Sequence, residues 1–286
     1  MASMYYYWSV RLIAKAAKVL GYDADHLRYA SLSQEIYAAI LREYFTLSGR
    51  LAVPTQTGLA LALAMGVFPE GARKRLICDL ELKLKNNHGL LTTGFVGTYF
   101  LCSVLAENGL IDRAYDLLLN EKMPGWLYEV NMGATTIWER WNSILPDGHV
   151  SDKGMNSMNH YAYGSIVEWM YRYMCGLYPS EDAPGFRQIA IRPMPSRRFD
   201  SAQAAYDSAS GRFESGWTWE KAGICYRIQI PFNASAEFIL PDGQKDAAVN
   251  GEPSAELQET GKLRLESGTY FIRAVFSHTP SKTDML

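Results

Sequence analysis

Residues 133–142 read Gly-Ala-Thr-Thr-Ile-Trp-Glu-Arg-Trp-Asn, and the interpretation of the whole chain begins there. The stretch places Glu139 between Trp138 and Trp141, beside a guanidinium and directly after a turn of small residues. Glutamate is rarely buried without a partner, so a carboxylate among indoles suggests a site. Sugars lay their apolar faces on tryptophan, and a carboxylate can activate water or hold hydroxyl groups. The same residues also fit a helix N-terminal turn, with Trp138 in the core and Glu139 in a salt bridge.

The composition is typical of a globular chain. Of its 286 residues, 48% are hydrophobic and 20% are charged, which suits one large or two medium domains. The formal net charge of −2 and the absence of a basic tract argue against nucleic acid as a partner. The aromatic share of 13% fits large cores or sugar-stacking surfaces.

The cysteines show neither a CxxC pair nor a spacing with histidine that zinc would need, so no metal and no cofactor are expected. Cys78, Cys102 and Cys175 lie in apolar helical patterns and are predicted to be buried free thiols. The apolar runs are far shorter than the roughly 20 residues that span a bilayer, so no membrane partner is expected. The first residues lack a secretory pattern, which slightly favours the cytoplasm and leaves the location open.

The first 178 residues show the 3.6-residue periodicity of helices. Gly21 is predicted to end the first helix, and a second is predicted from Asp25 to Gly49. Further helices are predicted over residues 57–65, 69–85, 94–105, 111–119 and 159–177. Short connections that contain glycine join them as hairpins, which is typical of a bundle or a toroid.

After a linker at residues 178–185, the hydrophobic period changes to two, as in strands. Asp242-Gly243 and Asn250-Gly251 are signals for tight turns. Several short strands at this spacing indicate a β-sandwich, followed by a polar tail at residues 277–286. The predicted strands cover residues 188–192, 212–220, 224–230 and 268–274.

The order of these segments resembles that of the bacterial α-L-rhamnosidases of glycoside hydrolase family 78. The WERW segment and the later NHYAYG segment (Asn159–Gly164) are the specific part of the resemblance. Weaker matches are Gln56-Thr57, Leu91–Thr98, Pro124–Tyr128 and Ile228–Asn233. The resemblance implies an α+β multidomain chain. Its parts would be an incomplete (α/α)6-barrel catalytic domain over residues 1–178 and a C-terminal antiparallel β-sandwich domain over residues 179–286.

The resemblance also implies inverting hydrolysis of terminal α-L-rhamnosides, with a rhamnose-containing glycoside or oligosaccharide as substrate. The family's general base matches Glu139, which would take a proton from the attacking water. The family's histidine that contacts rhamnose matches His160, which alone would fit an ordinary histidine at a helix start. Trp138 and Trp141 are predicted to be walls of the pocket, and Trp126 is a further candidate. Each of the three indoles also fits a core position.

One part of the family pattern has no match. The family's general acid lies in an upstream segment rich in Asp, Arg, Glu and Trp, and residues 1–57 contain no such segment. We therefore expect a portion of a rhamnosidase that lacks its N-terminal part, is inactive alone and leaves apolar faces uncovered on its first helices. The alternatives are a non-catalytic sugar-binding fragment and another (α/α)6 carbohydrate-active enzyme, such as a trehalase-like hydrolase or a polysaccharide lyase.

Overall fold

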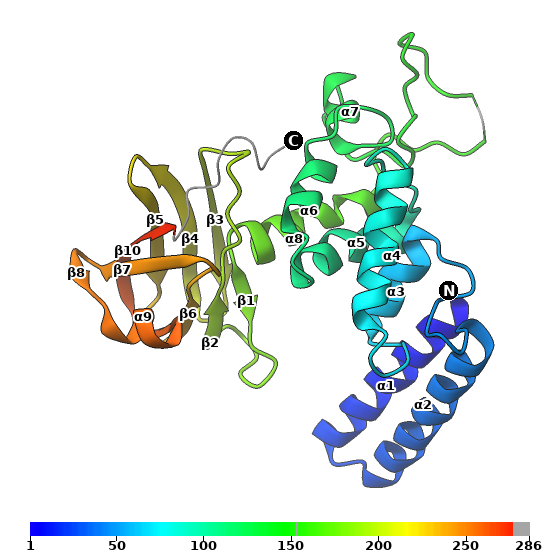
Figure 1. The fold of residues 1–286 in the computed structure, drawn as a ribbon, viewed down its shortest axis with the longest axis horizontal. Coiled ribbons are helices and arrows are strands. Elements are labelled where there is room, and N and C mark those ends of the chain that lie inside the picture. Colours follow the sequence, from blue (N-terminus) through cyan, green and yellow to red (C-terminus); the bar gives the residue numbers. More distant parts are fainter. Residues whose placement is uncertain (153, 277–286) are drawn as a thin grey trace. The chain divides into compact units, whose positions relative to one another are not determined.

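The computed structural model describes residues 1–152 and 154–276. The chain divides into two compact units, Met1–Ile166 and Val167–Leu286. Helices fill the first unit and strands dominate the second (Figure 1). The domain boundary between residues 178 and 179 stays a prediction, and the polar tail expected at 277–286 lies outside the described residues.

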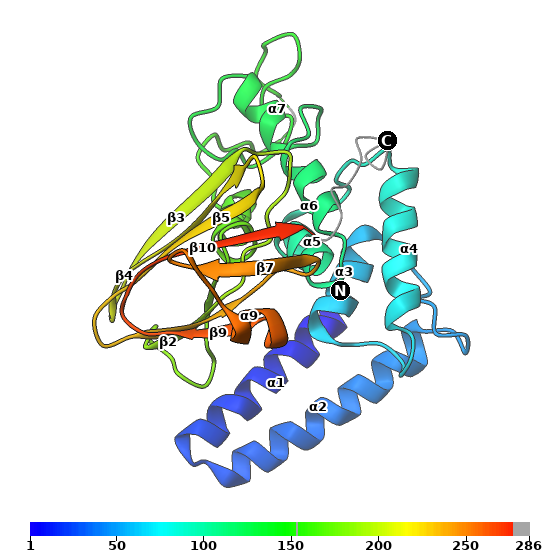
Figure 2. The same cartoon turned by 60° about the vertical axis from the view of Figure 1, so that its left-hand side comes forward.

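The helical unit consists of helices joined by short loops. Helices α1 and α2 lie side by side as a hairpin, which Figure 2 shows along its length. Gly21, with φ 75°, ends α1 as predicted. Helix α2 ends at Tyr44 rather than Gly49, because the chain turns into a β-bridge between Phe45 and Leu51. The helices are α1 (Ala2–Leu20), α2 (Asp23–Tyr44), α3 (Gln56–Met65), α4 (Arg73–Asn86), α5 (Phe95–Glu107), α6 (Ile111–Leu118) and α7 (Trp126–Asn131).

Helices α3 and α5 are buried over most of their residues and form the centre of this unit. Gly97 of α5 lies so close to α3 that an added Cβ would meet Thr57 Oγ1 at 2.5 Å. The fully buried Gln56 donates to Leu90 O and accepts from the Thr92 N–H, both at 2.9 Å. These contacts fix the first turns of α3 and α5 against each other.

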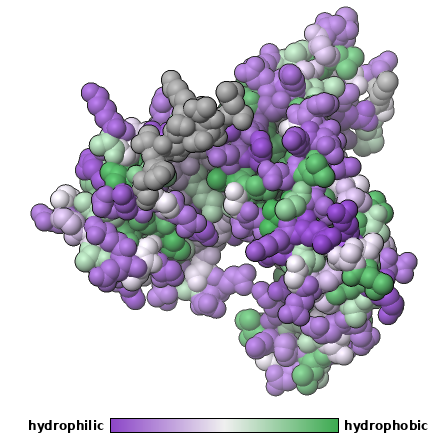
Figure 3. All heavy atoms as spheres, in the orientation of Figure 1, coloured by the Kyte–Doolittle hydropathy of each residue, from purple (hydrophilic) through white to green (hydrophobic). Residues whose placement is uncertain are grey.

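The α1–α2 hairpin exposes apolar side chains, as the sequence predicts. Val19 is 86% exposed, and Figure 3 shows hydrophobic residues on the surface of this hairpin. An exposed apolar surface of this kind favours association. The apolar side chains exposed on the hairpin include Leu12, Ile13, Val19, Leu20 and Leu27.

The prediction of one long helix over residues 159–177 is wrong. The chain forms a 3-10 turn η1 (Ala162–Ser165), one turn of α-helix α8 (Ile166–Trp169), a π-turn η2 (Met170–Met174) and strand β1 (Leu177–Pro179). Gly176, with φ 79°, ends the helical part, and its backbone lies so close to Pro193 that an added Cβ would meet Pro193 N at 2.2 Å. The predicted linker therefore begins with two residues of a strand.

The strand unit is a sandwich of two sheets. Within the described residues, one sheet has the order β1-β2-β6-β9 and the other the order β3-β4-β5-β10-β7-β8. Neighbouring strands are antiparallel except β2 and β6. The Tyr226 ring on β5 lies 5.3 Å from the Phe238 ring on β6, so the two sheets face each other. The predicted β-sandwich is confirmed.

The remaining elements of this unit are β2 (Gln188–Ile191), β3 (Ser201–Ser208), β4 (Gly211–Glu220), β5 (Gly223–Ile230), β6 (Ser235–Ile239), β7 (Gln244–Val249), β8 (Glu252–Pro253), α9 (Ala255–Thr260), β9 (Lys262–Leu265) and β10 (Gly268–Phe276). Asn250 and Gly251 have φ values of 52° and 95° and join β7 to β8, so the predicted tight turn is confirmed.

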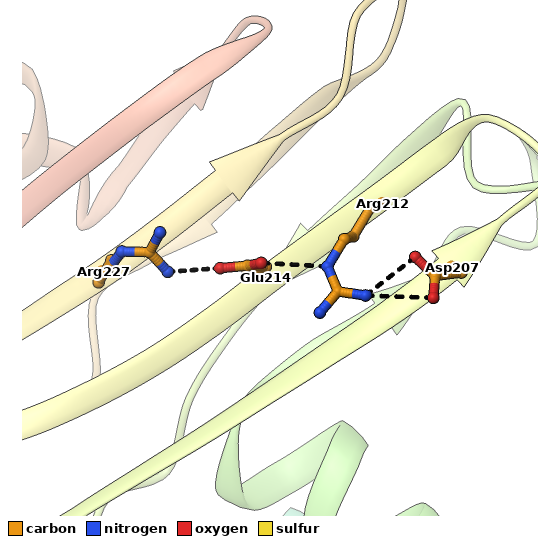
Figure 4. A network of polar contacts seen from close by, with 4 residues as sticks. All are labelled: Asp207, Arg212, Glu214 and Arg227. Atoms are coloured by element: carbon orange, nitrogen blue, oxygen red, sulfur yellow. Dashed lines mark hydrogen bonds and ion pairs between the residues drawn. The ribbon is translucent and has the colours of Figure 1, made fainter.

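A row of charged side chains crosses strands β3, β4 and β5 (Figure 4). Arg212 donates to Asp207 at 3.1 Å and to Glu214 at 3.1 Å. Arg227 donates to the other carboxylate oxygen of Glu214. The hydrogen bonds from Arg227 and Arg212 hold the pKa of Glu214 below its usual range.

The four cysteines, all within the described residues, form no disulfide bond. Cys102 and Cys175 are buried as predicted, and burial raises the pKa of each thiol to about 12. The prediction for Cys78 is wrong, because it is exposed. Helix α4 buries Leu76, Leu80 and Leu84, and Cys78 lies on another face of the helix.

Candidate active site

The segment that carries Glu139 is an irregular loop after α7. Gly133, with φ 88°, turns the chain out of the helix, and the Ala134 N–H then donates to Glu129 O at 3.0 Å. Since residues 134–143 are not helical, Trp138 and Trp141 do not share a helix face.

Backbone hydrogen bonds pair this loop with residues 157–160. The Glu139 N–H donates to Ser157 O at 2.9 Å, and the Ser157 N–H donates to Glu139 Oε2 at 2.8 Å. The His160 N–H donates to Ile137 O at 2.7 Å. The fold therefore brings Glu139 and His160 onto two adjacent segments. One carboxylate oxygen of the half-buried Glu139 is held by the backbone N–H of Ser157.

His160 is half-buried in a stack of rings. Its ring lies 4.9 Å from that of Phe95 and 5.1 Å from that of Tyr161, with interplanar angles of 16° and 11°. Its Nδ1 accepts from the Ala162 N–H at 3.2 Å, which in the neutral ring leaves the proton on Nε2. The stacked rings fix the orientation of the His160 imidazole. Its Nε2–H is then the group left to donate a hydrogen bond to a ligand.

A cavity of about 430 Å³ adjoins this stack. Its lining is mostly aromatic and aliphatic, and the buried Ser165 Oγ there makes no hydrogen bond within the described residues. A second cavity of about 450 Å³ lies in the strand unit around Arg187, Phe232 and Arg264, away from every predicted site residue. The chemistry of the first cavity, rather than its size, makes it the better candidate. Its walls are Phe95, Val96, Tyr99, Tyr161, Ala162 and Ser165.

Trp126, Trp138 and Trp141 are buried, with exposed fractions of 6%, 3% and 9%. The indole of Trp126 donates to Tyr163 O at 2.9 Å and lies perpendicular to Trp141 at 5.3 Å. Trp141 stacks on Tyr163 at 3.8 Å. The indoles of Trp126 and Trp141 thus belong to an aromatic cluster with Tyr163. Sugar contact by the three predicted tryptophans stays a prediction.

The sequence interpretation missed Glu129, Phe95 and Tyr163. Glu129 is 2% exposed, and burial raises the pKa of its carboxyl group to about 7, against the opposing effect of a hydrogen bond from the Trp138 backbone N–H. Glu129 lies three residues after Trp126, so the two share a face of α7. This spacing is the sequence signal that could have identified Glu129.

Among residues 1–152 and 154–276, no three His, Cys, Asp or Glu side chains are placed to hold a metal ion together. The helices in this described part of the chain are too short or too polar to cross a bilayer.

Family models match both units of the chain. Residues 1–174 match the bacterial alpha-L-rhamnosidase 6 hairpin glycosidase domain, and residues 176–254 match the bacterial alpha-L-rhamnosidase C-terminal domain. The chain belongs to the bacterial alpha-L-rhamnosidase family. The glycosidase family and the fold predicted from the sequence are thereby confirmed.

Individual rhamnosidases match over most of the chain. The alpha-L-rhamnosidase of Streptomyces avermitilis is 35% identical over 269 residues, and that of Formosa agariphila is 35% identical over 281 residues. Each alignment covers 94% of this chain, but 26% and 30% of the respective relative. The crystal structure of the Streptomyces avermitilis enzyme complexed with L-rhamnose has a TM-score of 0.85 at 34% identity and covers 96% of this chain. The chain thus spans less than a third of the length of these rhamnosidases.

Proposed function

We propose that Glu139 is the general base of a glycosidase that hydrolyses terminal α-L-rhamnosides with inversion. The observation that carries this proposal is the pairing of the Glu139 loop with the segment of His160. Glu139 would take a proton from the water that attacks the anomeric carbon, on the face opposite to the leaving group. Membership of the rhamnosidase family supports this assignment.

His160 would orient the sugar. Its Nε2 donates to a ring hydroxyl, while Phe95 and Tyr161 keep the imidazole from rotating. The aromatic cavity beside it fits the apolar face of a pyranose. The buried Trp126 and Trp141 pack against Tyr163, whose ring lies 5.0 Å from that of Phe95, and they would support this wall of the cavity from behind.

Inversion needs a general acid about 6.5–9.5 Å from the base. We assign this role to no residue of the chain, since Glu129 is too deeply buried to reach a leaving group. In this proposal another part of the protein supplies the acid. The 286-residue chain alone is then expected to bind rhamnose and to hydrolyse an aryl rhamnoside little or not at all.

A chimera tests the proposal. This chain would replace the matching stretch of the Streptomyces avermitilis relative, whose remaining sequence supplies the rest of a rhamnosidase. Proton NMR then identifies the first anomer released from an aryl α-L-rhamnoside. Release of β-L-rhamnose is the expected result, and release of the α anomer would contradict it. A folded but inert chimera that still binds L-rhamnose would favour a non-catalytic binding role.

A further inference from the structure

The loop that carries Glu139 contains a fully buried serine in a network of hydrogen bonds. Ser143 has an exposed fraction of 0%. Its Oγ lies 2.6 Å from Asn156 Oδ1 and 2.9 Å from Arg140 O, so its hydroxyl proton serves these two acceptors. The Arg140 N–H donates to the same Oγ at 3.3 Å. The buried hydroxyl group is thus satisfied by partners from two segments of the chain.

The Asn156 amide is held in one orientation. Its Nδ2 donates to two carbonyl oxygens, Ser143 O at 3.3 Å and Ser151 O at 3.4 Å. An amide turned over would place its own oxygen against these two carbonyl oxygens, so the network fixes Oδ1 as the atom that accepts from Ser143. The Ser151 N–H also donates to Ser143 O at 2.9 Å. The side chain of Asn156 therefore joins its own segment to residues 143 and 151.

This network connects the two peptide groups on either side of the Glu139 carboxylate. The Arg140 N–H, which donates to Ser143 Oγ, belongs to the peptide group that follows Glu139. The Ser157 N–H, which donates to Glu139 Oε2 at 2.8 Å, belongs to the peptide group that follows Asn156. The hydrogen bond between Ser143 and Asn156 therefore links the backbone next to Glu139 with the N–H that binds its carboxylate.

The two oxygens of the Glu139 carboxylate differ in their partners. Oε2 is bound by the Ser157 N–H, whereas Oε1 makes no hydrogen bond within the described residues. The place of the Ser157 peptide therefore sets the direction in which Oε1 points. His160 is held separately, because its own N–H donates to Ile137 O at 2.7 Å.

We infer that Asn156 is a positioning residue for the proposed base. Together with Ser143 it fixes the peptide whose N–H holds Glu139 Oε2, and Oε1 is thereby directed at the attacking water. Its effect on catalysis rests on the function proposed above, whereas its effect on the loop does not. Without this side chain the carboxylate samples several directions, and a displacement of about 1 Å at a reacting group lowers kcat about 10²-fold.

Hydrogen exchange of the Ser157 amide in the 286-residue chain tests the positioning itself. We expect Asn156→Ala and Ser143→Ala each to lower the protection of this amide about tenfold, because each removes one end of the same hydrogen bond. The double variant should lose little more than Asn156→Ala alone, since the pair acts as a unit. Asn131→Ala, which removes an exposed amide at the end of α7, is the control and should leave the protection unchanged.

Unchanged protection in both single variants, or additive losses in the double variant, would overturn the inference. The exchange measurement uses no sugar, so its failure is distinct from failure of the proposed function.

Kinetics of the chimera with the Streptomyces avermitilis relative test the consequence for catalysis. We expect Asn156→Ala to lower kcat about 10²-fold and to change KM for an aryl rhamnoside less than about threefold, because His160 is held by a different backbone contact. A merely structural role would disturb the whole site and raise KM as kcat falls. That result, or a kcat within about threefold of the original, would refute the positioning role.

Discussion

The two units place a glutamate in opposite surroundings. In the strand unit, Glu214 lies between Arg212 and Arg227, which lower its pKa. In the helical unit, Glu129 is buried against a peptide N–H, and its pKa rises to about 7. The charge of Glu214 is thus balanced on the strands of the sandwich, whereas the Glu129 carboxyl group on α7 has no cationic partner among the causes of its raised pKa. Buried carboxyl groups with a raised pKa are enriched at functional sites.

The difference also concerns what holds each region in place. The sandwich depends on a packed core of two sheets, whereas the irregular 134–143 loop is held by hydrogen bonds to residues 129, 156–158 and 160 together with the burial of Trp138 and Trp141. The following variants test this contrast, beginning with the largest expected change in stability or binding.

Trp217→Ala should destabilise the strand unit by about 4 kcal/mol, because a large buried side chain is lost together with its hydrogen bond to Met174 O. Urea unfolding followed by circular dichroism measures the change. The control is Phe232→Ala, which removes an 80% exposed ring and should cost less than about 0.5 kcal/mol. Equal effects would show that core packing does not dominate this unit.

Stability of the original chain should fall by about 3 kcal/mol relative to Glu129→Gln as pH rises from about 4.5 to about 7. The folded-state pKa of about 7 exceeds the ordinary value of 4.5, so the folded state holds the extra proton between those values. The stability is present below about pH 4.5 and is lost as pH rises through about 7. Urea unfolding of both proteins at several pH values measures the difference, and parallel curves would contradict the account.

His160→Ala should weaken L-rhamnose binding to the chain about tenfold, since one hydrogen bond to the sugar is lost. Isothermal calorimetry gives the affinity. His149→Ala provides a matched control, because the His149 side chain is 81% exposed. Equal affinities for the two variants would remove His160 from the proposed site.

Glu214→Gln should cost less than about 1 kcal/mol at neutral pH, because its partners are partly exposed. The pKa of Glu214 is lowered in the folded state, so its contribution is present above its unfolded value and is lost as pH falls through the folded one. The pH trend is therefore opposite to that for Glu129. The difference between variant and original chain in acid and neutral urea unfolding measures it, and a trend of the same sign would contradict the comparison.

Local sequence signals predict the first six helices and four of the ten strands in the described part of the chain. The Ala/Leu run predicts α3. Gly21 and the Asn250-Gly251 turn have the positive φ values that these residue types favour. Strand β3 was missed because Ser201–Ser208 lacks β-branched and strongly alternating residues, and it takes its conformation from pairing with β4.

The candidate site is harder to predict from local sequence signals than the helices and strands are. Glu139 and His160 are 21 positions apart, and the hydrogen bonds that join their segments are backbone bonds that no side-chain pattern encodes. The family resemblance, rather than periodicity, led to both residues. The 3.6-residue periodicity wrongly predicts one helix over residues 159–177. The conformation of this segment depends instead on Gly176 and on several buried aromatic rings.

Catalysis by the chimera with the Streptomyces avermitilis relative tests the role of Glu139 most directly. We expect Glu139→Gln to lower kcat about 10³-fold, because an amide cannot accept the proton of the attacking water. Glu121→Gln, with the same loss of charge at an exposed position, should leave kcat unchanged. A Glu139→Gln chimera that keeps kcat within about tenfold of the original would contradict the assignment of the base.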